Sequence, residues 1–159
     1  MSSLLLLFRW LGHTTVGVFL ARSTWGFPTI EMAHLIGLAG LGGEILIVDL
    51  GLLGIGPRRL PISRVARELF PLFLGSLVIM LASGILLVSA EAVKCYYNPA
   101  FRAKMVLLLF AIAISWAIQH NVIRSKADDH TSSWLKAAAI LSLVLWLSVG
   151  AAGRLIGLL

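Results

Sequence analysis

Four ionisable residues occur in an apolar stretch of the chain that is long enough to cross a lipid bilayer. The stretch covers residues 27–56, FPTIEMAHLIGLAGLGGEILIVDLGLLGIG, and contains Glu31, His34, Glu44 and Asp49. Carboxylates and imidazoles are costly in hydrocarbon, so such groups inside a span usually face a partner, a cofactor or water. We therefore look for function in this stretch first.

These four side chains share one broad face if the stretch forms a helix. With about 100° per residue and His34 as zero, Glu31 and Asp49 both fall at about +60°. Glu44 falls at about −80°, on the same side. The glycine-rich segment 40–43 thins the helix, which lets a second helix or a flat ligand approach the backbone.

The composition places the whole chain in a membrane. Of its 159 residues 59% are hydrophobic and 13% are charged, and the mean hydropathy is +0.97. These values predict an all-α transmembrane helical bundle that forms a single domain over residues 1–159. The net charge of +6 fits anchoring to anionic lipid better than binding to nucleic acid. The single cysteine, Cys95, excludes an intramolecular disulfide.

Five spans are predicted, four long ones and a shorter N-terminal one. The first, residues 3–22, carries several polar residues and either crosses against a partner helix or lies at the interface; we favour crossing. The remaining four are expected at about residues 28–54, 68–89, 100–122 and 134–158.

The strongest charge signal sets the predicted topology. Residues 57–67, PRRLPISRVAR, hold four arginines in eleven residues and no acid, which favours the cytoplasm. Counting five spans from this segment places the N-terminus in the cytoplasm and the C-terminus outside, with Cys95 also outside. Glu31, Lys104 and Arg154 then lie at similar depth, so we expect Glu31 to pair with Arg154 or Lys104.

Two histidines also lie at comparable depth in this arrangement. His13 is about 13 Å below the end of its helix, and His34 is about 9 Å below the end of its own. A b-type haem takes one imidazole on each face of its iron, and nearby glycines make room for the ring. Lys104, Arg154 or Arg22 would hold the propionates.

Each histidine has a structural alternative. His13 also fits an interfacial residue, and His34 also fits a hydrogen bond to the span at 134–158. His120 and His130 stand at or beyond a helix end, where histidine caps carbonyls or meets water. The methionines fit copper ligands or ordinary apolar packing.

Three segments resemble a family of small, uncharacterised bacterial inner-membrane proteins: residues 27–56, NPAFRAKMVLLLFAIA and WLSVGAAGRLIGLL. In that family a Glu-x-x-His pair opens a span, an Asp closes it and Phe-x-x-Lys opens a later one. The matching residues here are Glu31, His34, Asp49, Phe101 and Lys104. The members of that family are similar in the layout of their membrane spans to small b-type cytochromes and to the membrane protein of copper-resistance operons. The resemblance implies a multi-pass protein of the bacterial inner membrane.

We therefore expect a membrane-embedded redox protein in which His34, with His13, holds haem b. It would pass electrons between a quinone and a periplasmic partner protein. A second hypothesis is a copper or proton permease in which Glu31, Glu44 and Asp49 line a polar route with His34. A third is an accessory subunit without a cofactor. The sequence assigns no catalytic residue and leaves self-association into a homo-oligomer open.

If haem is bound, replacing His34 by Ala should abolish the strong blue absorption band of the purified protein. His34 is the histidine on the polar, glycine-lined face inside a long span. The His130→Ala variant should keep the band, because residue 130 follows a polar connection. An unchanged absorption spectrum in His34→Ala would place the ligand elsewhere.

Overall fold

Helices account for almost all of the structure, a computed structural model that describes residues 3–55, 61–124 and 132–156. In chain order the helices of these residues are α1 (Ser3–Gly12), α2 (Thr15–Arg22), α3 (Gly26–Leu52), α4 (Ile62–Ala90), α5 (Ala92–Tyr97), α6 (Pro99–Arg124) and α7 (Ser133–Ile156). Four of them, α3, α4, α6 and α7, are long and apolar enough to cross a membrane. The predicted all-α class is confirmed, whereas a fifth span is not found in the described residues.

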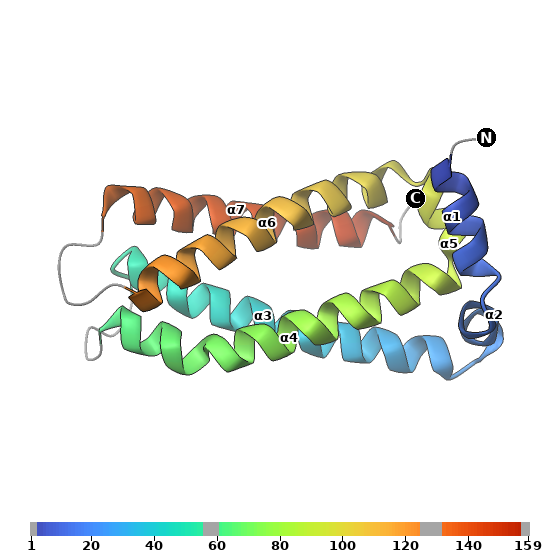
Figure 1. The fold of residues 1–159 in the computed structure, drawn as a ribbon, viewed down its shortest axis with the longest axis horizontal. Helices are drawn as coiled ribbons and strands as arrows, with labels where there is room; N and C mark the ends of the chain where they lie inside the picture. The colour runs from blue at the N-terminus through green and yellow to red at the C-terminus, as the bar shows by residue number, and fades with distance from the viewer. Residues whose placement is uncertain (1–2, 56–60, 125–131, 157–159) are drawn as a thin grey trace.

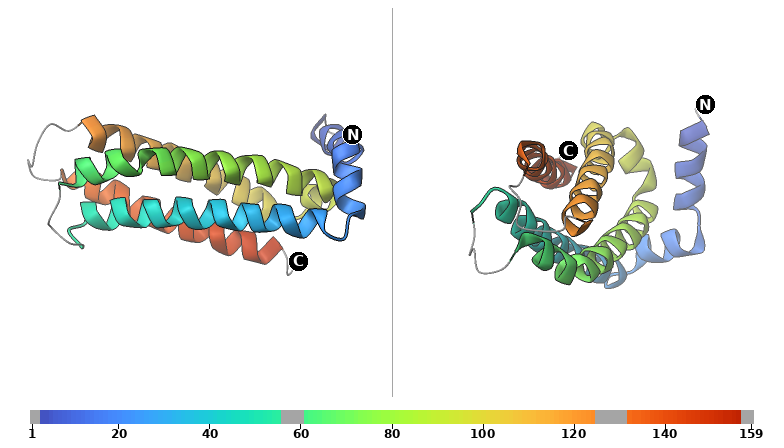
Figure 2. Two further views of the ribbon diagram at one scale, coloured as in Figure 1. Left: turned by 90° about the horizontal axis from the view of Figure 1, so that it is seen from below. Right: turned by 60° about the vertical axis from the view of Figure 1, so that its left-hand side comes forward.

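Two helical hairpins form the bundle, one from α3 and α4 and the other from α6 and α7 (Figure 1). The hairpins pack on each other through α3 against α7 and α4 against α6. We call the end marked by Leu52, Ile62, Arg124 and Ser133 the loop end. The short helices α1, α2 and α5 gather at the opposite end, which we call the cap end (Figure 2).

The single helix predicted over residues 3–22 is wrong, because the chain breaks at Thr14. The Thr14 hydroxyl accepts a hydrogen bond from the Gly17 N–H at 3.2 Å and donates to the Leu11 carbonyl at 2.7 Å. This arrangement ends α1 and caps the start of α2. With 10 and 8 residues, α1 and α2 are each too short to cross a bilayer.

Both ends of the described chain lie at the cap end. The ring of Phe8 in α1 is 5.7 Å from that of Tyr96 in α5 and 6.1 Å from that of Phe101 in α6. The side-chain amide of Asn98 donates to the carbonyl of Ile156, the last residue of α7, at 3.5 Å. Figure 1 shows the N and C marks at this same end. The prediction of termini on opposite sides of the membrane depends on a fifth span, which the described helices do not provide.

The second half of the arginine-rich segment is helical rather than a loop. Because α4 begins at Ile62 and not at residue 68, Arg64 and Arg67 lie on its first two turns. Residues 56–60, which include Arg58 and Arg59, lie outside the described residues, as does His130.

Two helix ends carry residues that favour such ends. The side-chain oxygen of Asn98 accepts hydrogen bonds from the N–H groups of Ala100 and Phe101, at 2.9 and 3.3 Å. Asn98 therefore caps α6, with Pro99 as its first residue. Beyond α3 the chain turns at Gly54, whose φ of +78° strongly favours glycine.

Small residues bring α3 and α4 close together. A β-carbon added to Gly37 would lie 3.0 Å from the backbone nitrogen of Met80 and 3.2 Å from the carbonyl oxygen of Ser76. Gly40 faces the Ser76 side chain in the same way. Close backbone approach at small residues is typical of helix packing in membranes. The packing interpretation therefore holds for these two glycines, whereas the pair at 42–43 has open space beside it.

The interior of the bundle contains two apolar clusters. The cap-side cluster consists of the buried residues Leu41, Ile45, Phe73, Met80, Leu108, Ala111 and Val149. The loop-side cluster consists of Val48, Leu52, Ala66, Ile118, Val122, Ala138 and Ala139. The boundary between them crosses α3 near Glu44, α6 near Ser115 and α7 near Ser142.

Cys95, expected in an exposed connection, is instead buried in α5, at 7% exposure. Burial, followed by the nearby Glu91 carboxylate, raises the pKa of its thiol. The thiolate is the species that reacts, so we predict slow maleimide labelling of the detergent-solubilised protein at neutral pH. The labelling rate should continue to rise at a pH where that of an ordinary thiol has levelled off.

The reference is a variant with Cys95→Ser and Thr24→Cys, which moves the thiol to an exposed position at the cap end. Equal labelling rates for the two proteins at neutral pH would show that Cys95 is accessible and contradict the expectation.

Candidate functional site

Two carboxylates are buried inside the bundle, at the boundary between the apolar clusters. Glu44 and Asp49, both on α3, are 1% and 2% exposed. They point inward because they lie on the face of α3 that also buries Leu41 and Ile45. Glu31, near the other end of the same helix, is exposed. The carboxylates singled out in the sequence therefore separate into a buried pair and an exposed residue.

Helices α6 and α7 supply polar partners for the buried pair. The side-chain amide of Gln119 donates a hydrogen bond to Oε1 of Glu44. The hydroxyl of Ser142 is close enough to Asp49 to interact with it, and it lies 3.4 Å from the hydroxyl of Ser115. We call these five residues the polar layer. It joins the two hairpins through side chains that are all buried.

Three oxygens of the polar layer have no hydrogen-bond partner: Oε2 of Glu44, Oδ2 of Asp49 and Oε1 of Gln119. Neither carboxylate has a cationic partner among the described residues, whose ion pairs are both at exposed positions. The two carboxylates also act electrostatically on each other. Because an unpaired buried charge is strongly disfavoured, the chemistry of this layer suits a proton or a small cation.

His34 belongs to a separate polar contact, nearer the cap end. Its Nδ1 lies 3.0 Å from Oγ of Ser83. Ser83 has one hydroxyl proton and donates it to the Ile79 carbonyl at 2.5 Å, so it accepts its other bond from Nδ1–H of His34. This tautomer leaves the Nε2 lone pair of His34 as an acceptor or metal ligand. The hydrogen bond to another helix that was the alternative role for His34 is therefore present, with α4 in place of α7.

Lys104, Arg154 and Glu31 do not form the ion pair that their similar depths predict. Lys104 is half-buried, and its Nζ would lie 3.3 Å from a β-carbon added to Gly153 of α7. The charges of Lys104 and Glu31 both act on His34. Arg154 and Glu31 are exposed, and neither takes part in the ion pairs of the described residues. The prediction that Glu31 forms an ion pair with Arg154 or Lys104 is therefore wrong for the described residues.

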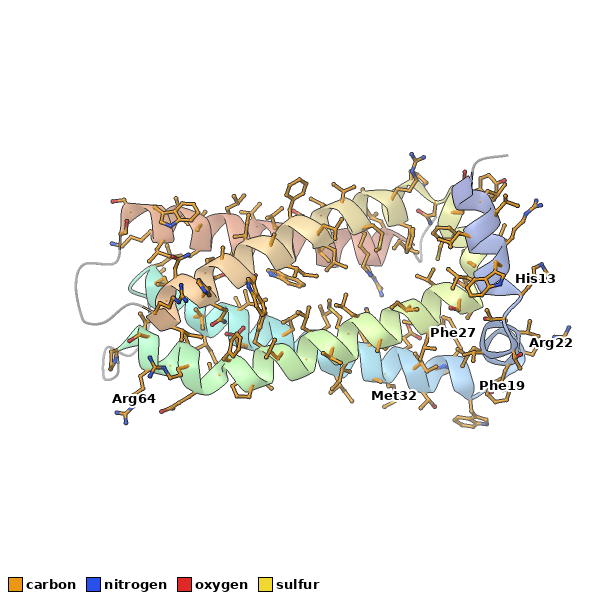
Figure 3. The ribbon with its side chains drawn as sticks, in the orientation of Figure 1. His13, Phe19, Arg22, Phe27, Met32 and Arg64 are labelled. Atoms are coloured by element: carbon orange, nitrogen blue, oxygen red, sulfur yellow. The ribbon has the colours of Figure 1, made fainter. Side chains whose placement is uncertain are left out.

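His13 lies at the cap end of the molecule. It is exposed where α1 meets α2, near Arg22 and at the opposite end of the molecule from Arg64 (Figure 3). His34, in contrast, is half-buried on α3 and contacts Ser83 of α4. Within the described ranges, no group of three or more His, Cys, Asp and Glu side chains is placed to hold a metal ion. Ligation of haem by the two histidines stays a prediction.

Sequence reasoning missed the partners that α6 and α7 contribute. Ser115 and Gln119 are four residues apart on α6, so they share one face of the helix. Ser142 and Trp146 repeat this spacing on α7, and the indole N–H of Trp146 donates to Oγ of Ser115 at 2.9 Å. Polar residues at this spacing within apolar spans were the signal that the sequence offered.

The fold and the polar layer together define a small all-helical protein whose described residues include four helices long and apolar enough to cross a membrane and two buried carboxylates without a cationic partner. Comparison with protein families matches residues 6–159 to a family described as a family of unknown function (DUF6644), and the chain belongs to this family. No curated protein and no solved structure matched the chain. The resemblance to an uncharacterised family is thereby supported, whereas the likeness to cytochromes and to the copper-resistance protein stays a prediction.

We predict that Gln119→Leu destabilises the protein by about 1–3 kcal/mol, because it leaves both carboxylate oxygens of Glu44 without a donor. The double variant Glu44→Leu, Gln119→Leu should lose less than the sum of the single variants, since it removes both partners. Thermal unfolding in detergent measures both effects.

Asn121→Leu is the matched control, because Asn121 is an exposed amide on the same helix. Its effect should be small. Full additivity of Glu44→Leu and Gln119→Leu would show that the two side chains are not coupled.

Proposed function

We propose that this protein is a membrane proton carrier in which Glu44 and Asp49 bind and release protons inside the bundle. The observation that carries the proposal is the group of three buried oxygens, on these two carboxylates and on Gln119, that have no donor. Protonation supplies what the group lacks, because a carboxylic acid donates a hydrogen bond and a carboxylate does not.

The charge balance of the layer supports reversible protonation. Two ionised carboxylates on one helix, almost fully buried and without a cationic partner among the described residues, repel each other. Binding one proton relieves that repulsion. Gln119 and Ser142 support the opposite step, because their donors stabilise an ionised Glu44 or Asp49 when a proton leaves. The layer is therefore suited to exchange protons and not to keep one permanent charge state.

The packing around the layer favours a carrier over an open pore. The loop-side cluster, with Leu52 and Val122, separates the layer from the loop end. The cap-side cluster, with Leu41 and Phe73, separates it from the cap end. Protons reach the layer when the packing of one cluster loosens, as in channels that are gated by an apolar constriction.

The positions of Glu44 and Asp49 along α3 suggest the order in which a proton from the loop end would reach them. Asp49 lies about 5 Å and Glu44 about 12 Å from the end of α3 at the loop end. The arginine-rich segment at this end favours the cytoplasmic side, so Asp49 would exchange protons with the cytoplasm first. If the loop end is cytoplasmic and the four long helices all cross the membrane, both termini are expected on the periplasmic side.

A b-type haem protein remains the second candidate, and one observation favours it. The Nε2 lone pair of His34 is the group that a haem iron would take, and Nδ1–H is fixed by Ser83, as is usual for a ligating histidine. The quinone, the periplasmic partner, copper and a homo-oligomer stay predictions from the sequence.

We expect liposomes that contain the protein to admit protons when a potassium diffusion potential is imposed, as measured with an enclosed pH-sensitive dye. Glu44→Gln and Asp49→Asn keep the size of the side chains but remove their ability to bind a proton. Each should reduce the flux to that of protein-free liposomes. Glu31→Gln is the matched control, since Glu31 is an exposed carboxylate on the same helix, and it should keep the flux.

Infrared spectra of the purified protein over a range of pH give a second measurement, independent of transport. The carbonyl band of a protonated carboxyl group should weaken in Glu44→Gln and Asp49→Asn and persist in Glu31→Gln. If Glu44→Gln and Asp49→Asn both kept the proton flux and the infrared carbonyl band, the proposal would be contradicted. A proton flux of the wild type no greater than that of empty liposomes would also contradict it.

A further inference from the structure

A groove between α4 and α6 at the loop end combines basic and aromatic side chains. Its volume is about 370 Å³. It is lined by Arg67, Phe70, Trp116, His120, Ile123 and Arg124. The start of α4 and the end of α6 approach each other at this place in both views (Figures 1 and 2). None of the lining residues belongs to the polar layer, so the groove is a separate feature of the molecule.

The rim of the groove carries a concentrated positive charge. The guanidinium of Arg67 donates one hydrogen bond to the carbonyl of Ile123 at 3.1 Å, which holds it against α6 while its other N–H groups remain available. Arg124 is exposed as the last residue of α6, and His120 is exposed one turn earlier. Three basic side chains from two helices therefore converge at the end of the bundle.

The acid nearest in sequence to this rim does not neutralise it. Glu68 is the one acidic residue in the described part of α4, and α6 has none. Its carboxylate lies 3.5 Å from Nε of Arg64, an exposed partner one turn earlier on α4. The charges of Arg67 and Arg124 therefore have no acidic partner among the described residues.

Aromatic rings form the part of the groove that lies deeper in the bundle. The rings of Phe70 and Trp116 are 6.0 Å apart, and the buried ring of Phe73 lies 6.4 Å from Trp116. Phe70 is one turn further from the loop end than Arg67, and Trp116 is one turn further than His120. Trp116 is 48% exposed, so its ring is available to a ligand. The surface of the groove is therefore almost entirely apolar, and Arg67, His120 and Arg124 are its basic lining residues.

We propose that this groove binds an anionic phospholipid, with the head-group phosphate at Arg67, His120 and Arg124 and an acyl chain against Phe70 and Trp116. Two features select this occupant. The basic rim lies at the helix ends, where head groups are found, and the aromatic surface lies one turn deeper, at the start of the hydrocarbon. A neutral ligand such as a quinone would leave two guanidinium groups without a counter-charge among the described residues.

Titration of the delipidated protein in detergent with phosphatidylglycerol tests the proposal, with the thermal unfolding midpoint as readout. Phosphatidylglycerol should raise the midpoint, and phosphatidylcholine and inorganic phosphate should not. One basic residue near an anionic lipid contributes about fivefold in affinity. The double variant Arg67→Gln, Arg124→Gln should therefore bind phosphatidylglycerol about thirtyfold more weakly.

The matched control is Arg22→Gln, Arg102→Gln, which removes the same charge at two exposed positions of the cap end. It should bind phosphatidylglycerol like the wild type. Equal affinities of the two double variants would overturn the proposal. Stabilisation by phosphatidylcholine or inorganic phosphate to the same extent as by phosphatidylglycerol would also overturn it, as would a quinone analogue that prevents phosphatidylglycerol from binding.

A measurement on the wild-type sequence does not depend on how the arginine variants fold. Phosphatidylglycerol with brominated acyl chains should quench the tryptophan fluorescence of the wild type more strongly than that of Trp116→Phe, because Trp116 contacts the chain. Identical fractional quenching of the two proteins would show that no acyl chain lies at Trp116.

Discussion

A polar group within the hydrocarbon layer has to find its partner inside the protein, and this requirement organises the structure. Backbone groups meet it by forming helices. Ser83 and Ser89 meet it on their own helix, by donating to backbone carbonyls three or four residues earlier. Glu44 and Asp49 have no such solution, because the interior of a helix offers no free N–H group. They depend on Gln119 of α6 and Ser142 of α7 for hydrogen-bond donors. The buried carboxylates of one hairpin therefore find their polar partners only in the other hairpin.

This dependence also fixes how the hairpins align. Apolar contacts between helices in a membrane are largely interchangeable, so they specify register weakly. A shift of α6 by one turn would move Gln119 away from Glu44 and would separate the Ser115 and Ser142 hydroxyls. The polar layer therefore specifies the packing of the two hairpins at the place where it divides the core into two clusters. The same residues that suit proton exchange thereby define the native arrangement.

The four long helices could be predicted because apolar length is a property of contiguous residues. The break at Thr14 could not, since a few polar residues also fit a helix that crosses against a partner. The two buried carboxylates stood out in the sequence, but Gln119, 75 residues from Glu44, becomes a partner only through packing. Depth along a helix likewise says nothing about which neighbouring helix a side chain meets, so the contact of His34 with Ser83 of α4 could not be predicted.

The position of both chain ends at the cap end has a consequence for assembly. If the four candidate helices all cross the membrane, two copies of this chain joined end to end by a short linker would insert in the same orientation, because an even number of crossings returns the chain to its starting side. Gene duplication and fusion would therefore give a parallel pair without an added crossing. For the same reason, a soluble domain fused to the N-terminus and one fused to the C-terminus would lie on the same side of the membrane.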